Sequence, residues 1–320
     1  MQPDKYKVVA VVVTYNRKRL LGECLRALER QRYPLESIIV VDNASTDGTD
    51  ALFESGSEFG DDGVIAYNRM GTNLGGAGGF KEGMRLASRT DCDWVWIMDD
   101  DCIVNDGTLS ELVGAFGVVG DGVSYLASSV FGPDGEPMNV PSVDLVPASN
   151  GYADWYRRLG DGVVRIRTAT FVSLLINRGA ILDVGLPIAS FFIWGDDSEY
   201  TNRLVKFFGP AYMVGSSRVL HERANAKALD IGLESNLTRL RNFRYHTRNN
   251  LVVKKLYGGR LSVAKGVVVN AVSAVRLLFS GDGGFRVRTR RAGSLVLGTM
   301  DFLLGRYELE DYASHCVRSR

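Results

Sequence analysis

The chain has 320 residues, of which 45% are hydrophobic and 23% are charged, and its formal net charge is +1. A chain of this length and composition can bury one large core or one core with an appendage, and its near-neutral charge gives no signal of overall nucleic-acid binding. The four cysteines show neither metal-ligand nor disulfide spacing, so we expect free thiols in a reducing compartment.

The N-terminal third predicts a repeated strand–helix pattern. We expect strands over 8–13, 38–41 and 64–67, and helices over 16–32 and from about 80 to 88. Right-handed crossovers bring the carboxyl ends of such parallel strands to one edge of the sheet. Asp42 ends the second of these strands, where it is either a helix N-cap or a ligand-binding carboxylate.

Two negative expectations follow from the apolar runs. The run Val8–Val13 is too short for a signal peptide and leads directly into polar residues. No segment offers about 18 uninterrupted apolar residues, so we expect no membrane-spanning helix.

A glycine-rich run follows the third strand. Gly75, Gly76, Gly78 and Gly79 come directly after Asn73 and Leu74. Such a run allows the backbone to approach a ligand closely at a helix start, or it forms only a flexible turn. It matches neither a Walker loop nor a dinucleotide-binding fingerprint.

Three carboxylates end the apolar run Trp94–Met98, which predicts a buried strand. Asp99 and Asp101 lie two residues apart, so in extended chain they point to the same side, at the carboxyl end of the strand. A divalent cation such as Mg²⁺ or Mn²⁺ is the simplest way to offset the repulsion between three adjacent charges. The alternative is a solvated acidic loop or a helix N-cap.

A second acidic stretch follows a Gly- and Pro-rich region (130–162), which is either an excursion over the site or a flexible insertion. After a strand over 168–176, an aromatic run leads into Gly195, Asp196 and Asp197, which open a helix. A carboxylate beside an aromatic wall suits a general base, and the alternative is an acidic helix N-terminus packed by aromatic residues. His221, after the next strand, is either structural or a ligand.

The C-terminal segment 254–291 is basic and apolar, with nine Lys or Arg residues against the single acid Asp282. At helical spacing, Ser262, Lys265, Ser273 and Arg276 share one narrow sector of a mostly apolar helix. This pattern is typical of a helix lying in a membrane surface, or of a helix packed on the core with a solvated basic stripe.

Five short motifs together resemble family 2 glycosyltransferases. They are Val-Val-Val-Thr-Tyr-Asn (11–16), Val-Val-Asp-Asn-Ala-Ser-Thr-Asp-Gly-Thr (40–49), Asn-Leu-Gly-Gly-Ala-Gly-Gly-Phe (73–80), Met-Asp-Asp-Asp (98–101) and Trp-Gly-Asp-Asp-Ser-Glu-Tyr (194–200). The resemblance implies an α/β GT-A nucleotide-sugar-binding fold with a mostly parallel central sheet. It also implies inverting transfer from a nucleotide sugar. We expect a catalytic domain over 1–225 and a largely helical C-terminal region over 226–320.

The resemblance also implies roles for individual residues. It makes Asp197 the catalytic base and makes Asp99, Asp101 and His221 the ligands of Mn²⁺ or Mg²⁺. Thr14 and Asp42 are expected near the nucleobase. The residues expected to bind the nucleotide sugar are Thr14, Tyr15, Asn16, Asp42, Asn73, Gly75, Gly76, Asp99 and Asp100. Acceptor-binding or supporting roles fall to Trp194, Asp196, Glu199 and Arg248, and we expect Arg248 near an acceptor diphosphate.

The glycine run, the strand 94–101 and the stretch Tyr245–Asn250 look most like actinobacterial galactofuranosyltransferases of cell-wall galactan synthesis. The resemblance implies UDP-galactofuranose as donor, a polyprenyl-linked saccharide as acceptor, and a peripheral location on the inner face of the cell membrane, with an anionic membrane surface as a further partner. Alternatives are a rhamnosyltransferase using dTDP-rhamnose, a noncatalytic nucleotide-sugar or glycan-binding module, and a phosphatase or nucleotidyltransferase built on the acidic triplet.

Overall fold

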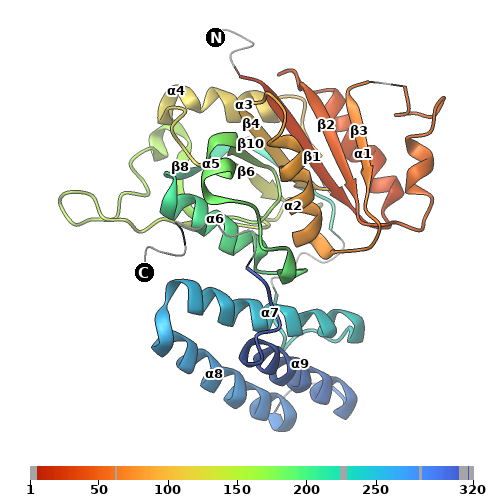
Figure 1. Ribbon diagram of the computed structural model, residues 1–320. Helices are drawn as coiled ribbons and strands as arrows, with labels where there is room; N and C mark the ends of the chain where they lie inside the picture. The colour runs from red at the N-terminus through yellow and green to blue at the C-terminus, as the bar shows by residue number, and fades with distance from the viewer. Residues whose placement is uncertain (1–5, 62, 224–228, 281–282, 310–315, 317–320) are drawn as a thin grey trace.

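The structure is a computed structural model that describes residues 6–61, 63–223, 229–280, 283–309 and 316 (Figure 1). A twisted sheet with helices on both faces forms the larger part, and three C-terminal helices form a separate layer beside it. The expected domain boundary at 225/226 lies outside the described residues.

The sheet places the ends of its first strands at one edge. Its order is β3-β2-β1-β4-β9-β6-β10-β8-β7, with β5 paired to β10. The strands are β1 Val8–Thr14, β2 Ser37–Asp42, β3 Ile65–Arg69, β4 Trp94–Asp99, β5 Cys102–Val104, β6 Tyr125–Phe131, β7 Ser142–Val143, β8 Val163–Thr168, β9 Leu174–Asn177 and β10 Ala211–His221. Strands β3, β2, β1 and β4 are parallel, with Thr14 opposite Asp42 and Val13 opposite Asp99. The expectation of a shared carboxyl edge is therefore confirmed.

The far half of the sheet is mixed rather than parallel. The single strand expected over 168–176 is wrong, because the chain forms β8 and β9 with an irregular segment between them. Strand β9 runs antiparallel to both β4 and β6. A chain that reverses between two short strands cannot keep one extended conformation, and this accounts for the difference.

The β-branched run of β1 is buried on both faces. Val9, Val11 and Val13 belong to one hydrophobic core, and Val8, Ala10 and Val12 belong to the other. This alternation explains why the strand reads as a continuous apolar run. The α-helices are α1 Lys18–Glu29, α2 Gly75–Ala87, α3 Thr108–Gly114, α4 Phe116–Val119, α5 Arg178–Val184, α6 Asp196–Phe207, α7 Leu237–Tyr257, α8 Gly259–Ser280 and α9 Phe285–Leu303. The 3₁₀ turns are η1 Thr49–Leu52, η2 Leu159–Asp161 and η3 Ala189–Phe191.

The glycine run forms the start of α2 rather than a loop before a helix, so the expected helix start near residue 80 is wrong. A Cβ on Gly79 would lie 2.5 Å from Cγ1 of Val13, and a Cβ on Gly83 would lie 2.3 Å from Cγ1 of Val11. Glycine at these positions lets α2 pack directly against β1. Tertiary contact therefore outweighs the low helix propensity of glycine here.

We expect Gly79→Ala to lower the free energy of unfolding by about 1–3 kcal/mol, because the added methyl overpacks the contact between α2 and β1. Gly76→Ala is the matched control, since a Cβ there meets no atom within 4 Å. Urea unfolding of both variants measures the difference. Equal stability of the two variants would contradict the packing role of Gly79.

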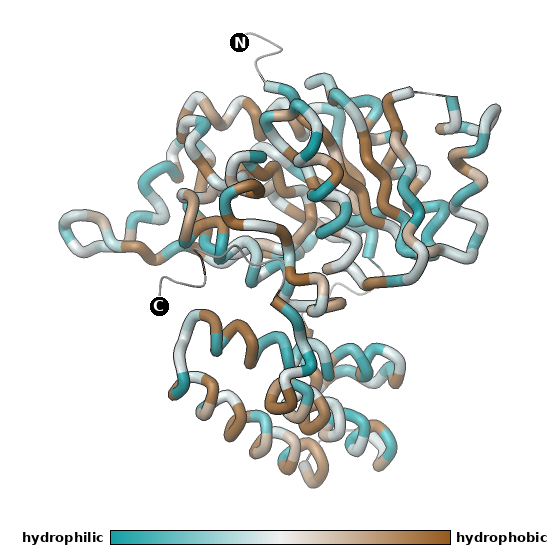
Figure 2. The backbone as a smooth tube through the Cα atoms, in the orientation of Figure 1, coloured by the Kyte–Doolittle hydropathy of each residue, from teal (hydrophilic) through white to brown (hydrophobic). Residues whose placement is uncertain are grey.

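The three C-terminal helices differ in how they meet solvent. Helix α7 contributes Leu251, Val252 and Leu256 to one of the two cores of the sheet. Helix α8, the outermost in Figure 1, has a long apolar stretch visible in Figure 2. Within the described residues, Gly259–Phe279 is long and apolar enough to cross a membrane by length and composition, with a mean hydropathy of 1.6 and only 11% of that window buried. Arg260, Lys265 and Arg276 interrupt this stretch, so it is not an uninterrupted apolar run, and the expectation of no membrane-spanning helix stays a prediction.

Candidate active site

The three predicted metal ligands lie together at the carboxyl edge of the sheet. Ligand atoms of Asp99, Asp101 and His221 lie within 4.8 Å of one another. Asp99 ends β4, and antiparallel pairing places His221 of β10 opposite Cys102 of β5, directly after Asp101. The sheet topology thus joins residues that are more than a hundred positions apart in the sequence.

The electrostatics of this cluster favour a cation. Burial, followed by the charges of Asp101 and Asp100, raises the pKa of Asp99 well above its ordinary value, and Asp196 adds to the effect. Burial alone would also raise the pKa of Asp101, but hydrogen bonds from His221 and Arg17 hold it below its ordinary value. Two carboxylates and an imidazole at this spacing fit a divalent cation, which would relieve the repulsion around Asp99.

Asn139 and two arginines complete this edge, and the sequence motifs did not identify them. The amide oxygen Oδ1 of Asn139 lies 2.8 Å from Nδ1 of His221. Because an amide oxygen only accepts hydrogen bonds, Nδ1 donates to Asn139, and Nε2 lies 3.0 Å from Oδ1 of Asp101, to which it can also donate. Asn139 comes from the region 130–162, so one residue of that excursion does reach the site.

Arg17 lies beside the acidic triplet. Its Nη1 is 3.1 Å from Oδ1 of Asp100 and also contacts Oδ2 of Asp101. Arg223 is a second cation that interacts electrostatically with Asp99 and Asp101, and burial lowers its pKa. The position of Arg17 directly after Thr14-Tyr-Asn was the signal in the sequence that could have identified it.

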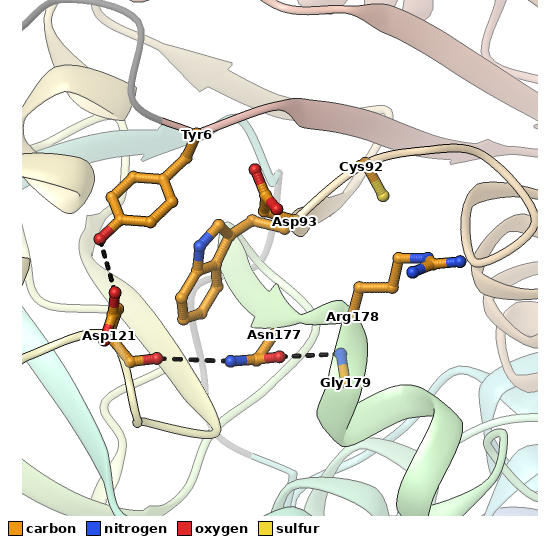
Figure 3. Close-up of a pocket in the computed structure, with 8 residues that line it drawn as sticks. Tyr6, Cys92, Asp93, Asp121, Asn177, Arg178 and Gly179 are labelled. Atoms are coloured by element: carbon orange, nitrogen blue, oxygen red, sulfur yellow. Dashed lines mark hydrogen bonds between the residues drawn. The ribbon is translucent and has the colours of Figure 1, made fainter.

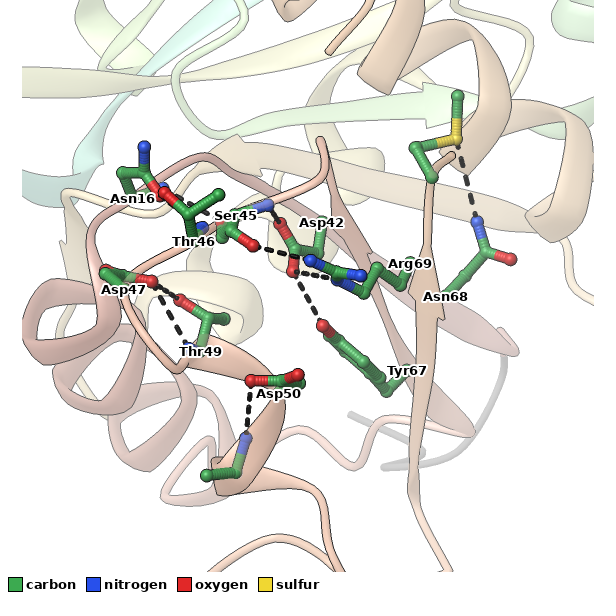
Figure 4. Close-up of polar contacts among 12 residues, drawn as sticks. Asn16, Asp42, Ser45, Thr46, Asp47, Thr49, Asp50, Tyr67, Asn68 and Arg69 are labelled. Carbon is green, nitrogen blue, oxygen red and sulfur yellow. Dashed lines mark hydrogen bonds and ion pairs between the residues drawn. The ribbon is translucent and has the colours of Figure 1, made fainter. Parts of the chain in front are cut away.

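The residues expected near the nucleobase are mostly buried. Thr14 donates a 2.7 Å hydrogen bond to Asp100, and burial raises the pKa of Asp100 to about 6. Asp42 has no exposed surface, and it accepts hydrogen bonds from the backbone N–H of Ser45 and the hydroxyl of Tyr67 (Figure 4). Thr14, Asp42 and Asp100 therefore hold neighbouring groups in place beneath the surface of this edge.

More exposed residues lie on the same edge. Tyr15 is 44% exposed directly after β1. Asn16 accepts a 2.7 Å hydrogen bond from the backbone N–H of Thr46, which joins the end of β1 to the loop after β2. Tyr15 is therefore an aromatic side chain of the first motif that a planar ligand can reach.

The residues at the start of α2 pack closely against the segment that contains Phe192. Asn73 accepts a 2.7 Å hydrogen bond from the backbone N–H of Gly75. Gly75 has a φ of +73°, and a Cβ there would lie 2.0 Å from the carbonyl oxygen of Phe192, so only glycine fits. Gly76 faces open space and is the glycine of this run that a ligand can approach.

The second acidic pair begins α6, as expected. Asp196 is buried, whereas Asp197 is partly exposed and accepts a 2.6 Å hydrogen bond from the backbone N–H of Ser198. Burial, and then the charge of Asp197, raises the pKa of Asp196 to about 8, and burial also raises the pKa of Asp197. Two adjacent carboxylates cannot both ionise easily, so one of the pair favours the protonated form, and the partly exposed Asp197 is the member that an acceptor hydroxyl can reach.

The loop before α6, residues 191–195, has an unusual backbone. Phe192, Trp194 and Gly195 have φ values of +63°, +61° and +98°. Such conformations persist only where surrounding contacts hold them. Nδ2 of Asn249 lies 2.8–3.3 Å from the carbonyl oxygens of Phe191, Ile193 and Trp194, and the N–H of Ala77 donates to Phe192. Helices α7 and α2 therefore fix the loop that carries the acidic pair.

Two residues that were predicted to bind or support the sugar acceptor, Glu199 and Arg248, form hydrogen bonds within the protein. Glu199 has no exposed surface, and it pairs with Arg203 at 2.9 Å and accepts a 2.7 Å hydrogen bond from Tyr257. Arg248 donates to the carbonyl oxygens of Ser190 and Arg306 and to the side chain of Asn249. The guanidinium of Arg248 is buried and its hydrogen bonds are used within the protein, and its expected position beside an acceptor diphosphate stays a prediction.

Trp194 is partly exposed two residues before Asp196, and its acceptor-binding role stays a prediction. Its partly exposed ring packs edge-on against Phe243 and His246, with centroid distances of 5.0 and 6.2 Å. His246 lies in the stretch Tyr245–Asn250 that resembles galactofuranosyltransferases, although the resemblance assigned this residue no role. Its Nδ1 is buried and has no hydrogen-bond partner, and burial lowers its pKa.

We expect Asn249→Ala to lower kcat by about 100-fold, because small displacements of a catalytic group can cost that much. The donor KM should change little, since the cluster of Asp99, Asp101 and His221 is made by other elements. Asn250→Ala is the matched control, because Asn250 is exposed and its side chain hydrogen-bonds to His246 rather than to the loop 191–195. Steady-state kinetics alongside thermal melting separate the two roles. A loss of stability with unchanged kcat would show that Asn249 is purely structural.

A pocket of about 250 Å³ lies at the opposite end of β1 and β4 (Figure 3). Tyr6 donates to Asp121, and Asn177 donates to the carbonyl oxygen of Asp121 while accepting from Gly179. Its polar groups are thus largely paired with one another, and none of the expected site residues lines it. The functional site is at the carboxyl edge instead.

Comparison with known protein families classifies the chain. The model of "Glycosyl transferase family 2" matches residues 9–171, which include β1, the loop after β2 and the acidic triplet. The chain belongs to glycosyl transferase family 2. The resemblance inferred from the motifs is therefore confirmed, and the chain is a glycosyltransferase.

Among curated proteins, the chain is similar to galactofuranosyltransferases from two mycobacterial species. The chain is 32% identical over 203 residues to galactofuranosyltransferase GlfT1 of Mycolicibacterium smegmatis, covering 62% of this chain and 65% of that protein. It is 30% identical over 207 residues to GlfT1 of Mycobacterium tuberculosis, covering 62% and 64%. The matches thus span slightly less than two thirds of these relatives.

Solved structures confirm the GT-A fold. GalNAc-T7 with UDP, GalNAc and Mn²⁺ has a TM-score of 0.61 at 15% identity, covering 94% of this chain and 57% of that one. The mannosyltransferase PcManGT from Pyrobaculum calidifontis, in complex with GDP-Man and Mn²⁺, has a TM-score of 0.53 at 18% identity, covering 96% and 90%. TarS 1–349 of S. aureus in complex with UDP has a TM-score of 0.54 at 15% identity, covering 96% and 94%.

Proposed function

We propose that this glycosyltransferase transfers galactofuranose from UDP-galactofuranose to a lipid-linked saccharide, with inversion at the anomeric carbon and with Mn²⁺ or Mg²⁺ as cofactor. The observation that carries the proposal is that Asp99, Asp101 and His221 lie within electrostatic reach of the Asp196–Asp197 pair. The galactofuranosyltransferase relatives support this choice of donor.

The first cluster suits the donor diphosphate. A bound divalent cation would neutralise charge on the leaving diphosphate. Asp99, Asp101 and His221 would hold that cation, and Asn139 would keep Nε2 of His221 directed at it. Arg17 and Arg223 add positive charge on the same side and would stabilise the departing group.

The acidic pair suits the acceptor hydroxyl. Asp197 would remove the hydroxyl proton as the acceptor oxygen attacks the anomeric carbon. Burial and the charge of Asp197 raise the pKa of Asp196, and a proton held by Asp196 would leave Asp197 as the ionised partner. Trp194 offers an aromatic surface beside this pair, against which a sugar ring can pack.

Turnover with a panel of donors tests the proposal. UDP-galactofuranose, dTDP-rhamnose, UDP-galactopyranose and GDP-mannose would each be supplied with a synthetic polyprenyl-diphosphate disaccharide, with Mn²⁺ or with EDTA. Metal-dependent transfer from UDP-galactofuranose is the expected result. Transfer only from dTDP-rhamnose would replace the donor assignment, and binding without transfer from any donor would contradict the catalytic assignment.

We also propose that α8 lies on the inner surface of the cell membrane. Its exposed face carries Leu261, Val268, Val272 and Phe279, which are 61–85% exposed. Lys265 falls on the same side, where it can meet anionic headgroups. A helix that lies flat would leave the lipid-linked acceptor within reach of the site.

Sedimentation with phosphatidylglycerol vesicles tests this location. Val268→Ser combined with Val272→Ser should lower the bound fraction several-fold, because both side chains are exposed and contribute apolar area. Leu182→Ser is the control, as Leu182 is 60% exposed on α5. Equal binding of the double variant and the wild type would contradict membrane contact by α8.

A further inference from the structure

A basic groove lies between α7 and α9, apart from the residues assigned above. It has a volume of about 620 Å³ and contains two arginines from each helix. Arg241 and Arg244 are three residues apart on α7, and Arg286 and Arg290 are four apart on α9, so each pair shares one helix face. We call this the α7–α9 groove.

The groove is strongly positive. None of the described residues that line it is acidic. Arg244 is paired with Asp301, which also binds Arg306, whereas Arg241, Arg286 and Arg290 form no ion pair within the described part of the chain. Four guanidinium groups that face one space favour an anion with several oxygens, and phosphate groups match their geometry.

The groove is open at Gly293, and the surface of α9 becomes apolar beyond this residue. A Cβ on Gly293 would meet no atom within 4 Å. Leu297, Met300 and Leu304 continue the same stripe at helical spacing and are 47%, 48% and 59% exposed. The surface is thus cationic at one end and apolar at the other, which suits a phosphate group joined to a hydrocarbon chain.

The groove also adjoins the loop that carries the acidic pair. Tyr245 lines the groove, and its ring stacks on Phe192 with centroids 4.9 Å apart. Phe192 lies four residues before Asp196. A ligand in the groove therefore lies beside the acceptor side of the proposed active site.

We propose that the α7–α9 groove binds the diphosphate of the lipid-linked acceptor, a diphosphate ester of a long-chain isoprenoid alcohol. This inference rests on the proposed function, because it assigns a position to the carrier of that acceptor. Arg241, Arg286 and Arg290 would bind the phosphate oxygens, and Leu297 and Met300 would contact the first isoprene units. The groove would then hold the carrier while its saccharide reaches Asp197.

Calorimetry with geranylgeranyl diphosphate in detergent micelles tests the binding site directly. Arg241→Gln combined with Arg290→Gln should weaken binding by at least about tenfold, the effect of losing charge-assisted hydrogen bonds. Gly293→Leu should weaken it similarly by filling the groove. Arg260→Gln is the control, because Arg260 is exposed on α8 and does not line the groove. Thermal melting verifies that each variant is folded.

Kinetics then connect the groove to transfer. The double variant should show a raised KM for the lipid-linked acceptor and an unchanged KM for the nucleotide sugar. Equal binding of geranylgeranyl diphosphate and geranylgeraniol would overturn the inference, as would an unchanged Kd in both the double variant and Gly293→Leu. If phosphatidylglycerol competed as well as the diphosphate, the groove would be a general anionic-lipid site and the assignment would be wrong.

Failure of the inference is distinguishable from failure of the proposed function. Transfer that persists with unaltered acceptor KM in both groove variants would overturn the groove while leaving the enzyme assignment intact. Arginine-dependent binding of the diphosphate, with no transfer from any nucleotide sugar, would support the groove and contradict the proposed function.

Discussion

Replacement of Asp197 by Asn is expected to lower kcat by about 10²–10⁴-fold, the usual contribution of a general base. The amide has nearly the shape of the carboxylate, and it can still accept the hydrogen bond from Ser198. The KM for the nucleotide sugar should therefore stay close to that of the wild type. Steady-state kinetics with saturating acceptor measure both quantities.

Asp196→Asn provides the matched control at the neighbouring position. Burial and the charge of Asp197 raise the pKa of Asp196 to about 8, which favours the neutral form of its side chain near pH 7. A neutral amide should then cost less than about tenfold in kcat, far below the loss expected for a base. The reverse order of effects, with Asp196→Asn the more damaging, would assign the base to Asp196 instead.

The dependence of rate on pH follows with a definite sign. A base acts in its ionised form, and burial raises the pKa of Asp197 above that of an ordinary carboxyl group. As the pH is lowered, we therefore expect kcat/KM to begin to fall at a higher pH than it would if the base were an exposed aspartate. This acid limb should be absent from the residual activity of Asp197→Asn, and its persistence there would point to another group.

Asp101→Asn is expected to lower kcat/KM by about 10³-fold or more, because stabilisation of a leaving group by a bound cation is worth several kcal/mol. The variant removes one member of the three-residue cluster and also weakens the contacts that Asp101 makes with Arg17 and His221. Titration with Mn²⁺ at fixed donor concentration measures the activation constant, which should rise sharply.

Asp100→Asn is the control within the same acidic triplet. Asp100 contacts Thr14 and Arg17 and is not part of the cluster of potential ligands. Its replacement should leave the Mn²⁺ activation constant within about threefold of the wild type, whatever its effect on stability. Equal shifts in the activation constant for both variants would show that the triplet acts only through its total charge.

The sequence was most informative where a local pattern has one structural solution. The run Val8–Val13 is typical of a strand buried on both faces, and strand–helix repetition implied that the strands ending in Asp42 and Asp99 would have their carboxyl ends at one edge of the sheet. The pairing of β1 with β2 and β4 confirms that arrangement. The two-residue spacing of Asp99 and Asp101 likewise predicted a shared side.

The sequence was least informative where a long-range contact decides the role of a residue. The glycine run resembled a ligand-binding turn, but the close approach of Val13 makes it a helix packed on the sheet. The sequence suggested that Arg248 is a free cation, but in the structure the carbonyl oxygens of Ser190 and Arg306 accept its hydrogen bonds. Asn139 has no local signal at all, because its partner His221 lies 82 residues away.

The central claim is that Asp99, Asp101 and His221 form a divalent-metal site for a nucleotide sugar. Anomalous diffraction at the manganese absorption edge, from crystals grown with Mn²⁺ and UDP, tests it most directly. We predict a single strong anomalous peak between these three side chains, in contact with the diphosphate of UDP. Bound UDP with no anomalous peak at this position, or with the peak at other residues, would contradict the claim.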